Sequence, residues 1–133
     1  MLFDTSVCID LLRERGRGIQ GPAHGALERL GSTPIHISLF SLCELEAGMS
    51  LSDRPEVERR RVNALVNHLT VLAPDDAFAV LYGEAAAHLL RNGTPIPVMD
   101  LLIGVTAKSR SLPVLTRDTT HFGRIPGLVV EGY

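Results

Sequence analysis

Short apolar runs that alternate with longer amphipathic stretches are the feature that most constrains the fold of this 133-residue chain. Five runs have the length of β-strands, and six longer segments have the length of helices. This alternation indicates βαβ units, and therefore a mostly parallel sheet of four or five strands with helices on both faces. The predicted strands are Met1–Phe3, Ile35–Ile37, Thr70–Leu72, Val114–Leu115 and Leu128–Val130, and the predicted helices are Val7–Arg15, Ala23–Leu30, Ser41–Ala47, Glu56–Leu69, Asp76–Leu90 and Asp100–Ser109.

Local signals refine two of these helices. The dipeptide Asn92-Gly93 is a typical helix stop, and the apolar stretch Leu101–Val105 predicts a helix buried on all sides. Gly83 and Gly104 lie inside predicted helices, where glycine costs about 1 kcal/mol relative to alanine. Close backbone packing would compensate for that cost, so we expect both glycines to lie against a neighbouring element.

Composition places the chain among globular proteins, with 45% hydrophobic and 21% charged residues and a net charge of −2. There is no linker or repeat, so residues 1–133 are expected to form one domain. There is no apolar run long enough for a membrane span and no signal-like start, so we expect a cytoplasmic protein. The two cysteines, Cys8 and Cys43, lie in apolar helical patterns and are predicted to be reduced core thiols rather than a disulfide or a zinc site.

Four acidic residues follow or lie near the carboxyl ends of predicted strands. Asp4 ends the first strand, Glu44 lies in the first turn of the helix after the second, Asp100 opens the sixth helix, and Asp118 follows the fourth strand. In a parallel sheet the functional crevice forms where the strands end and the chain turns toward a helix. The sequence therefore predicts that these four carboxylates point into one crevice.

Each acid also has a purely structural interpretation. Asp4 and Asp100 are suitable helix caps, Ser41 and Glu44 match a capping box, and Asp118 is typical of a turn. Two unit charges about 5 Å apart repel by about 3 kcal/mol at an effective dielectric of 20. Four converging carboxylates therefore call for a cation, and hard oxygen ligands favour Mg²⁺ or Mn²⁺.

These residues resemble those of PIN-domain endoribonucleases, specifically the VapC-type toxins of type II toxin–antitoxin pairs. The resemblance extends over essentially the whole chain and is carried by Phe3–Val7, Ile37–Gly48, Asp100–Ala107 and Leu115–Phe122. It implies a PIN-like three-layer α/β/α sandwich. The family often has a residue other than glycine at position 104, and often a glycine before the last-but-one strand, where this chain has Arg110-Ser111.

The resemblance implies a Mg²⁺- or Mn²⁺-dependent endoribonuclease that hydrolyses RNA phosphodiester bonds. Asp4, Glu44, Asp100 and Asp118 match the acidic quartet of the family. Asp4 and Asp100 are the first-choice metal ligands and Asp118 is the next, whereas Glu44 orients the attacking water, binds a second ion or positions a water ligand. Ser6 and Thr116 carry hydroxyl groups that are expected to orient these acids. They are not expected to act as nucleophiles, because the motif places no His or Lys base beside either of them.

Basic residues near the last acid suit phosphate. Arg117 and Arg124 flank Asp118 and are candidate RNA contacts, although both also fit solvated loop charges. The run Arg59–Arg61 is more typical of a solvated helix face than of an RNA contact. His121 is the one histidine near the predicted site.

The resemblance also implies a partner, a small VapB-like antitoxin that neutralises the nuclease. An antitoxin helix would fit a groove between the first predicted helix and the helix Glu56–Leu69. The apolar residues of that first helix, Val7, Ile9, Leu11 and Leu12, also fit the core of the monomer, and for Ile9 and Leu12 we expect mainly the core. A homodimer is expected, with the face around Gly83 as its candidate surface and with a larger hetero-oligomer as the form taken with the antitoxin.

Two other classes of function compete with this reading. Another Mg²⁺-dependent phosphatase of the haloacid-dehalogenase type would need Asp at position 6 and a positioned lysine, but position 6 is Ser and the single lysine is Lys108 near a helix end. A PIN-fold RNA-binding or interaction protein without catalysis would gain nothing from a focused negative cluster.

Overall fold

Five parallel strands form one sheet in the order β3-β2-β1-β4-β5. The structure is a computed structural model and describes residues 1–133. Phe3 of β1 pairs with both Ile37 of β2 and Leu115 of β4, so these three strands end side by side. The strands are β1 (Leu2–Phe3), β2 (His36–Ser38), β3 (Thr70–Leu72), β4 (Val114–Leu115) and β5 (Val130–Glu131).

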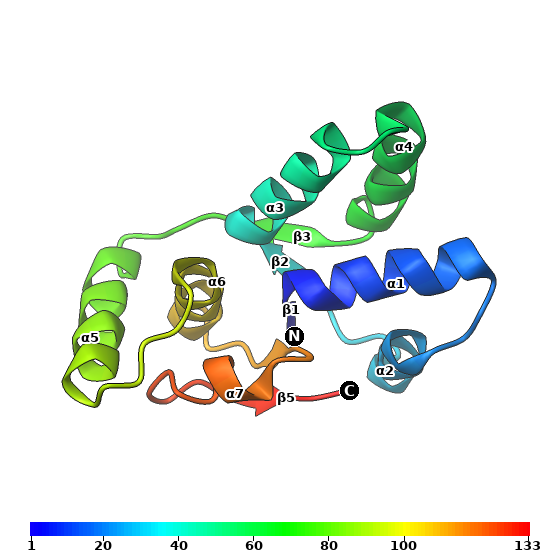
Figure 1. The fold of residues 1–133 in the computed structure, drawn as a ribbon. Coiled ribbons are helices and arrows are strands. Elements are labelled where there is room, and N and C mark those ends of the chain that lie inside the picture. Colours follow the sequence, from blue (N-terminus) through cyan, green and yellow to red (C-terminus); the bar gives the residue numbers. More distant parts are fainter.

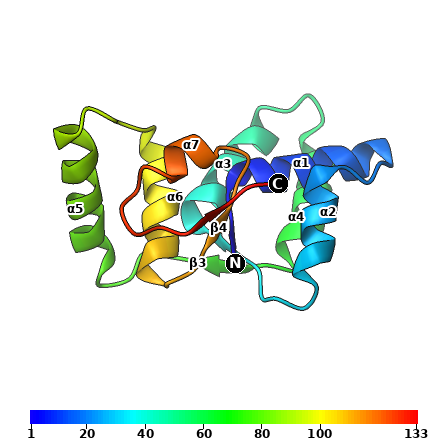
Figure 2. The same ribbon diagram turned by 90° about the horizontal axis from the view of Figure 1, so that it is seen from below.

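Seven helices cover the two faces of this sheet. In Figures 1 and 2, α5, α6 and α7 lie on one side of the strands, and α1, α2 and α4 lie on the other. None of the helices combines the length and the apolar character that a membrane span requires. The helices are α1 (Thr5–Arg17), α2 (Pro22–Leu30), α3 (Leu39–Ser50), α4 (Pro55–Val66), α5 (Phe78–Arg91), α6 (Val98–Ser109) and α7 (Thr119–Phe122).

The central strand β1 divides the apolar interior into two cores. Successive strand residues point to opposite faces, so Phe3 packs with Val7 of α1 and Ile37, whereas Leu2 packs with Ile103 of α6 and Val114. Both residues of β1 are completely buried. This burial on both faces confirms the doubly covered parallel sheet that the sequence predicts.

Strand and helix positions agree with the sequence prediction, with differences at the ends. The helix α6 begins at Val98 after Pro97, so Asp100 lies inside the first turn and does not open the helix. The helix α3 begins at Leu39, which puts Glu44 in the second turn rather than in the predicted first turn. The four-residue helix α7 was not predicted, because four residues are too few to show a helical period.

Packing predictions for the glycines and cysteines have mixed outcomes. A Cβ on Gly104 would lie 2.3 Å from Cδ1 of Ile125, so close packing at Gly104 is confirmed, but a Cβ on Gly83 would meet nothing within 4 Å, so close packing there is wrong. Cys8 is buried, and burial raises the pKa of its thiol to about 12. Cys43 is exposed on α3, so its assignment to the core was wrong.

Candidate active site

Asp4 lies directly after β1 and caps the N-terminus of α1. Its Oδ1 accepts a hydrogen bond of 2.6 Å from the backbone N–H of Thr5. Its Oδ2 accepts from Oγ of Ser6 at 2.6 Å and from Oγ1 of Thr116 at 2.9 Å. The predicted cap is confirmed, and the same bonds fix the orientation of the carboxylate at the end of the sheet.

Glu44 projects from α3 toward the start of α1. Oγ1 of Thr5 donates a short hydrogen bond to Oε2 of Glu44. The predicted capping box is wrong, because Ser38 caps α3 by accepting a bond of 2.9 Å from the backbone N–H of Ser41. Glu44 is therefore free of any capping role and points to the ends of the strands.

Asp100 and Asp118 meet at His121. Nδ1 of His121 lies 2.9 Å from Oδ2 of Asp100 and 2.7 Å from Oδ2 of Asp118. Oδ1 of Asp118 caps α7 by accepting from the backbone N–H of His121 at 3.0 Å. Burial raises the pKa of the Asp100 carboxyl, and the negative charges of Asp4 and Asp118 act in the same direction, whereas the hydrogen bond from His121 opposes them.

The four predicted acids line one open cleft at the carboxyl ends of the strands. Its volume is about 500 Å³, and Asp4, Glu44, Asp100 and Asp118 form its acidic lining. One ligand atom from each of Asp100, Asp118 and His121 lies within 4.8 Å of the others. Carboxylate and imidazole donors at this spacing fit a divalent cation.

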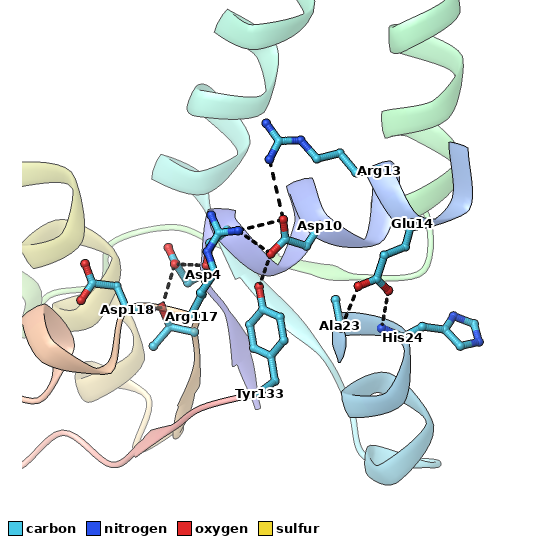
Figure 3. Close-up of polar contacts among 11 residues, drawn as sticks. Asp4, Asp10, Arg13, Glu14, Ala23, His24, Arg117, Asp118 and Tyr133 are labelled. Carbon is cyan, nitrogen blue, oxygen red and sulfur yellow. Dashed lines mark hydrogen bonds and ion pairs between the residues drawn. The ribbon is translucent and has the colours of Figure 1, made fainter. Parts of the chain in front are cut away.

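Arg117 lines the cleft, but its guanidinium is turned toward α1 (Figure 3). Its Nη1 donates to both carboxylate oxygens of Asp10, at 3.1 and 2.8 Å, and the hydroxyl of Tyr133 donates to Oδ2 of the same residue at 2.9 Å. Nη1 of Arg124 donates to the carbonyl oxygen of Pro95 at 3.3 Å. The two arginines named as phosphate contacts therefore have partners within the chain.

Sequence reasoning did not assign roles to four residues that shape this region: Thr5, Asp10, His121 and Tyr133. For Thr5 and His121 a signal existed, because each is adjacent to or within three positions of a predicted acid. For Asp10 and Tyr133 there was none, since their contact joins residues at opposite ends of the chain.

A groove continues from the acidic cleft along α1, α3 and α4. Its volume is about 540 Å³, and Glu44 lines both the groove and the cleft. The floor is apolar and the edges carry charged side chains, most of them basic. The apolar lining residues are Ile9, Leu12, Leu45, Met49 and Val62, and the basic ones are Arg13, Arg17 and Arg61.

Comparison with known proteins gives a consistent picture. The PIN domain family model matches residues 1–128. A Salmonella typhimurium protein named tRNA(fMet)-specific endonuclease VapC is 32% identical over 132 residues, which are 99% of this chain and 96% of that protein.

Two solved structures are similar along nearly their full length. VapBC2 from Rickettsia felis, bound to a DNA fragment from its promoter, has a TM-score of 0.89 and 26% identity and covers 99% of this chain and 97% of its own. DNA-bound VapBC from Salmonella typhimurium has a TM-score of 0.87 and 31% identity, with coverages of 98% and 96%.

Proposed function

This chain belongs to the PIN-domain family and to its VapC-type members, and we propose on that basis that it is a metal-dependent endoribonuclease, the toxin of a type II toxin–antitoxin pair. The observation that carries the proposal is the convergence of four carboxylates from four separate segments on one open cleft. A cluster of this kind repels polyanions unless a cation occupies it, so RNA binding at the cleft requires one.

The residues at the cleft have two proposed roles here, to hold the cation and to orient one of its ligands. Asp4, Asp100 and Asp118 hold the cation, for which Mg²⁺ and Mn²⁺ are the proposed identities since the donors are hard oxygens. A bound divalent cation supplies Lewis acidity toward the phosphate and acidifies water. Ser6 and Thr116 orient the Asp4 carboxylate through the two bonds to its Oδ2.

Glu44 acts on the water side of the reaction. Its Oε2 accepts a hydrogen bond from Thr5, and its side chain lines the cleft, where it is proposed to orient the attacking water. Binding a second ion or positioning a water ligand are the other roles consistent with this placement. Arg117 and Arg124 are proposed phosphate contacts, supported by the position of Arg117 on the rim of the cleft.

Cleavage of RNA by the purified protein tests this function. Asp100→Asn keeps the size of the side chain and removes one negative charge, so we expect folded protein without Mg²⁺- or Mn²⁺-dependent cleavage. Asp53→Asn, on the exposed turn between α3 and α4, is the matched control and should cleave at the wild-type rate. The RNAs tested should include transfer RNA, because the similar Salmonella protein is named for its action on a transfer RNA.

The result distinguishes the competing functions. Wild-type cleavage by Asp100→Asn would contradict the proposed site. RNA binding without cleavage by the wild-type protein would favour a PIN-fold binding module, and hydrolysis of phosphomonoesters alone would favour a phosphatase.

The groove along α1 is the proposed docking site of a VapB-like antitoxin. Its apolar floor suits an amphipathic helix. Because Glu44 lines both the groove and the acidic cleft, the end of such a helix can reach the acids. We expect coexpression with the cognate antitoxin to give a tight complex without ribonuclease activity. The isolated toxin is expected to be a homodimer with twofold symmetry.

Two variants test the docking site. Leu12→Arg places a charge on the groove floor, whereas Leu90→Arg changes an apolar side chain that is 72% exposed on α5. We expect Leu12→Arg to lose the antitoxin and retain cleavage, and Leu90→Arg to retain the antitoxin. Equal antitoxin binding by Leu12→Arg and wild type would place the antitoxin elsewhere.

A further inference from the structure

His121 lies beside the cleft, in contact with two of its acids, a position that an acidic site alone does not explain. Its Nδ1 approaches one oxygen of Asp100 and one of Asp118, at 2.9 and 2.7 Å. Both carboxylates belong to the proposed cation site, so the imidazole nitrogen lies among the ligand atoms and not behind them.

The spacing matches the coordination shell of a small divalent ion. With bonds of about 2.1 Å at right angles, neighbouring ligand atoms of an octahedral ion lie about 3 Å apart. The two distances from Nδ1 are close to this edge length, and all three ligand atoms lie within 4.8 Å of one another. Small movements of the oxygens therefore bring all three atoms onto one ion.

The backbone holds His121 in this place. Its N–H donates to Oδ1 of Asp118, and the neighbouring Phe122 is completely buried against the core on the α6 side of the sheet. The ring is partly exposed, at 33%, so an ion from solvent can reach it. A side chain that its own helix fixes beside two carboxylates, and that solvent partly reaches, is already positioned for ligation.

We propose that His121 binds the cation directly through Nδ1, together with Asp100 and Asp118, and that the proton in its hydrogen bond with Asp100 passes to solvent when the ion binds. This inference rests on the proposed metal-dependent function and deepens it. A nitrogen ligand changes the preference of the site, because Mg²⁺ favours oxygen donors whereas imidazole binds transition ions better. The site therefore selects Mn²⁺ over Mg²⁺ more strongly than four carboxylates would.

Electron spin echo spectroscopy of the Mn²⁺-bound protein tests the bond itself. A nitrogen bound to Mn²⁺ modulates the echo strongly, so the wild-type protein should show nitrogen modulation that shifts when the five histidines are labelled with ¹⁵N. His121→Ala should lose the modulation, and its dissociation constant for Mn²⁺ should rise by at least about tenfold. His24→Ala, on the distant helix α2, should change neither.

Affinity alone does not decide the question, since a histidine that only orients the two carboxylates would also weaken binding when removed. His121→Asp therefore provides a second variant that supplies an oxygen ligand. It should bind Mn²⁺ without nitrogen modulation and show a smaller ratio of Mn²⁺ to Mg²⁺ affinity than the wild type.

Each remaining outcome overturns the inference in a distinct way. Bound Mn²⁺ without nitrogen modulation in the wild type would reject His121 as a ligand and leave the proposed nuclease function intact. Modulation that persists in His121→Ala would assign the nitrogen to another residue. Absence of any bound Mn²⁺ in the spectrum would reject both the ligand and the metal-dependent function.

Discussion

Arg117 and Asp10 form an ion pair in which one guanidinium nitrogen lies 3.1 and 2.8 Å from the two carboxylate oxygens. The pair ties the loop that carries Asp118 to the second turn of α1, whose cap is Asp4. The Asp10 side chain is 16% exposed and the Arg117 side chain 58%, so solvent screens the attraction only in part. This contact links two of the segments that carry the acids.

A double-mutant cycle with Asp10→Asn and Arg117→Gln measures this link. We expect a coupling free energy of about 0.5–1 kcal/mol, in the range of partly exposed pairs. Urea unfolding of the four proteins gives the value. Additive effects of the two substitutions would show that the ion pair contributes nothing to stability.

Tyr133 makes stability depend on alkaline pH. Burial, and next the hydrogen bond to Asp10, raise the pKa of its phenol above the ordinary value of about 10. A raised folded-state pKa contributes stability that is complete below pH 10 and is lost as the pH rises toward the folded-state value. Between pH 9 and 11 the free energy of unfolding should fall more steeply for the wild type than for Tyr133→Phe. Parallel curves would assign no linkage to this phenol.

Divalent cations should stabilise the fold by relieving repulsion among the four acids. At one hundred times its dissociation constant a cation adds about 2.7 kcal/mol. The melting temperature should therefore rise with Mn²⁺, and Asp4→Asn should reduce that rise while keeping the helix cap. A melting temperature that ignores saturating Mn²⁺ would mean that the four acids do not form one cation site.

The same substitution at two helical glycines should have opposite effects. Gly83→Ala gains helix propensity in open space and should stabilise the isolated chain by up to about 1 kcal/mol. Gly104→Ala puts a Cβ against the buried Ile125 and should destabilise it by about 1–2 kcal/mol, since overpacking exceeds the propensity gain. Thermal unfolding at low protein concentration compares them. If Gly83→Ala instead weakens a homodimer, the dimer surface predicted around Gly83 gains support.

Ser111 is the only residue other than glycine with a positive φ, at 52°. This conformation costs an L-residue about 1 kcal/mol or more, and glycine adopts it freely. Ser111→Gly should therefore raise the free energy of unfolding by a few tenths to about 1 kcal/mol, after the greater entropy of an unfolded glycine is subtracted. Ser109→Gly, within the last turn of α6, should lower it, and chemical denaturation separates the two signs.

The convergence of the acids was predictable because it follows from topology. Apolar runs too short for helices identify strands, parallel strands end at one edge, and polar residues at those ends must meet there. Asp4 and Asp118 follow this rule, whereas Asp100 reaches the same edge from the first turn of α6, which comes after a helix and not after a strand. The rule places residues at an edge but says nothing of their partners, which is why the contact between His121 and two of these acids was not foreseen.

Other features depend on packing between distant segments, which local patterns in a single sequence do not reveal. The buried carboxylate of Glu14 accepts from the backbone N–H groups of Ala23 and His24 (Figure 3). It also accepts from the N–H of Gly21 and so fixes the start of α2. No cap motif announces this, because the acid belongs to the preceding helix. Cys43 was misplaced because α3 carries apolar residues on most of its surface, so its sequence does not identify the exposed face.

The hydrogen bond from Thr116 to Asp4 joins residues 112 positions apart, and it has a consequence during protein synthesis. The segments β1 and α1 leave the ribosome before β4 has been synthesised. Until then the edge of β1 that pairs with β4 has no partner, and Asp4 has no contact with Thr116 and no neighbouring Asp100 or Asp118. A nascent chain therefore has no assembled acidic cleft until its final part has emerged. A nascent copy of this nuclease therefore lacks the complete site that it would need to cleave the message from which it is being translated.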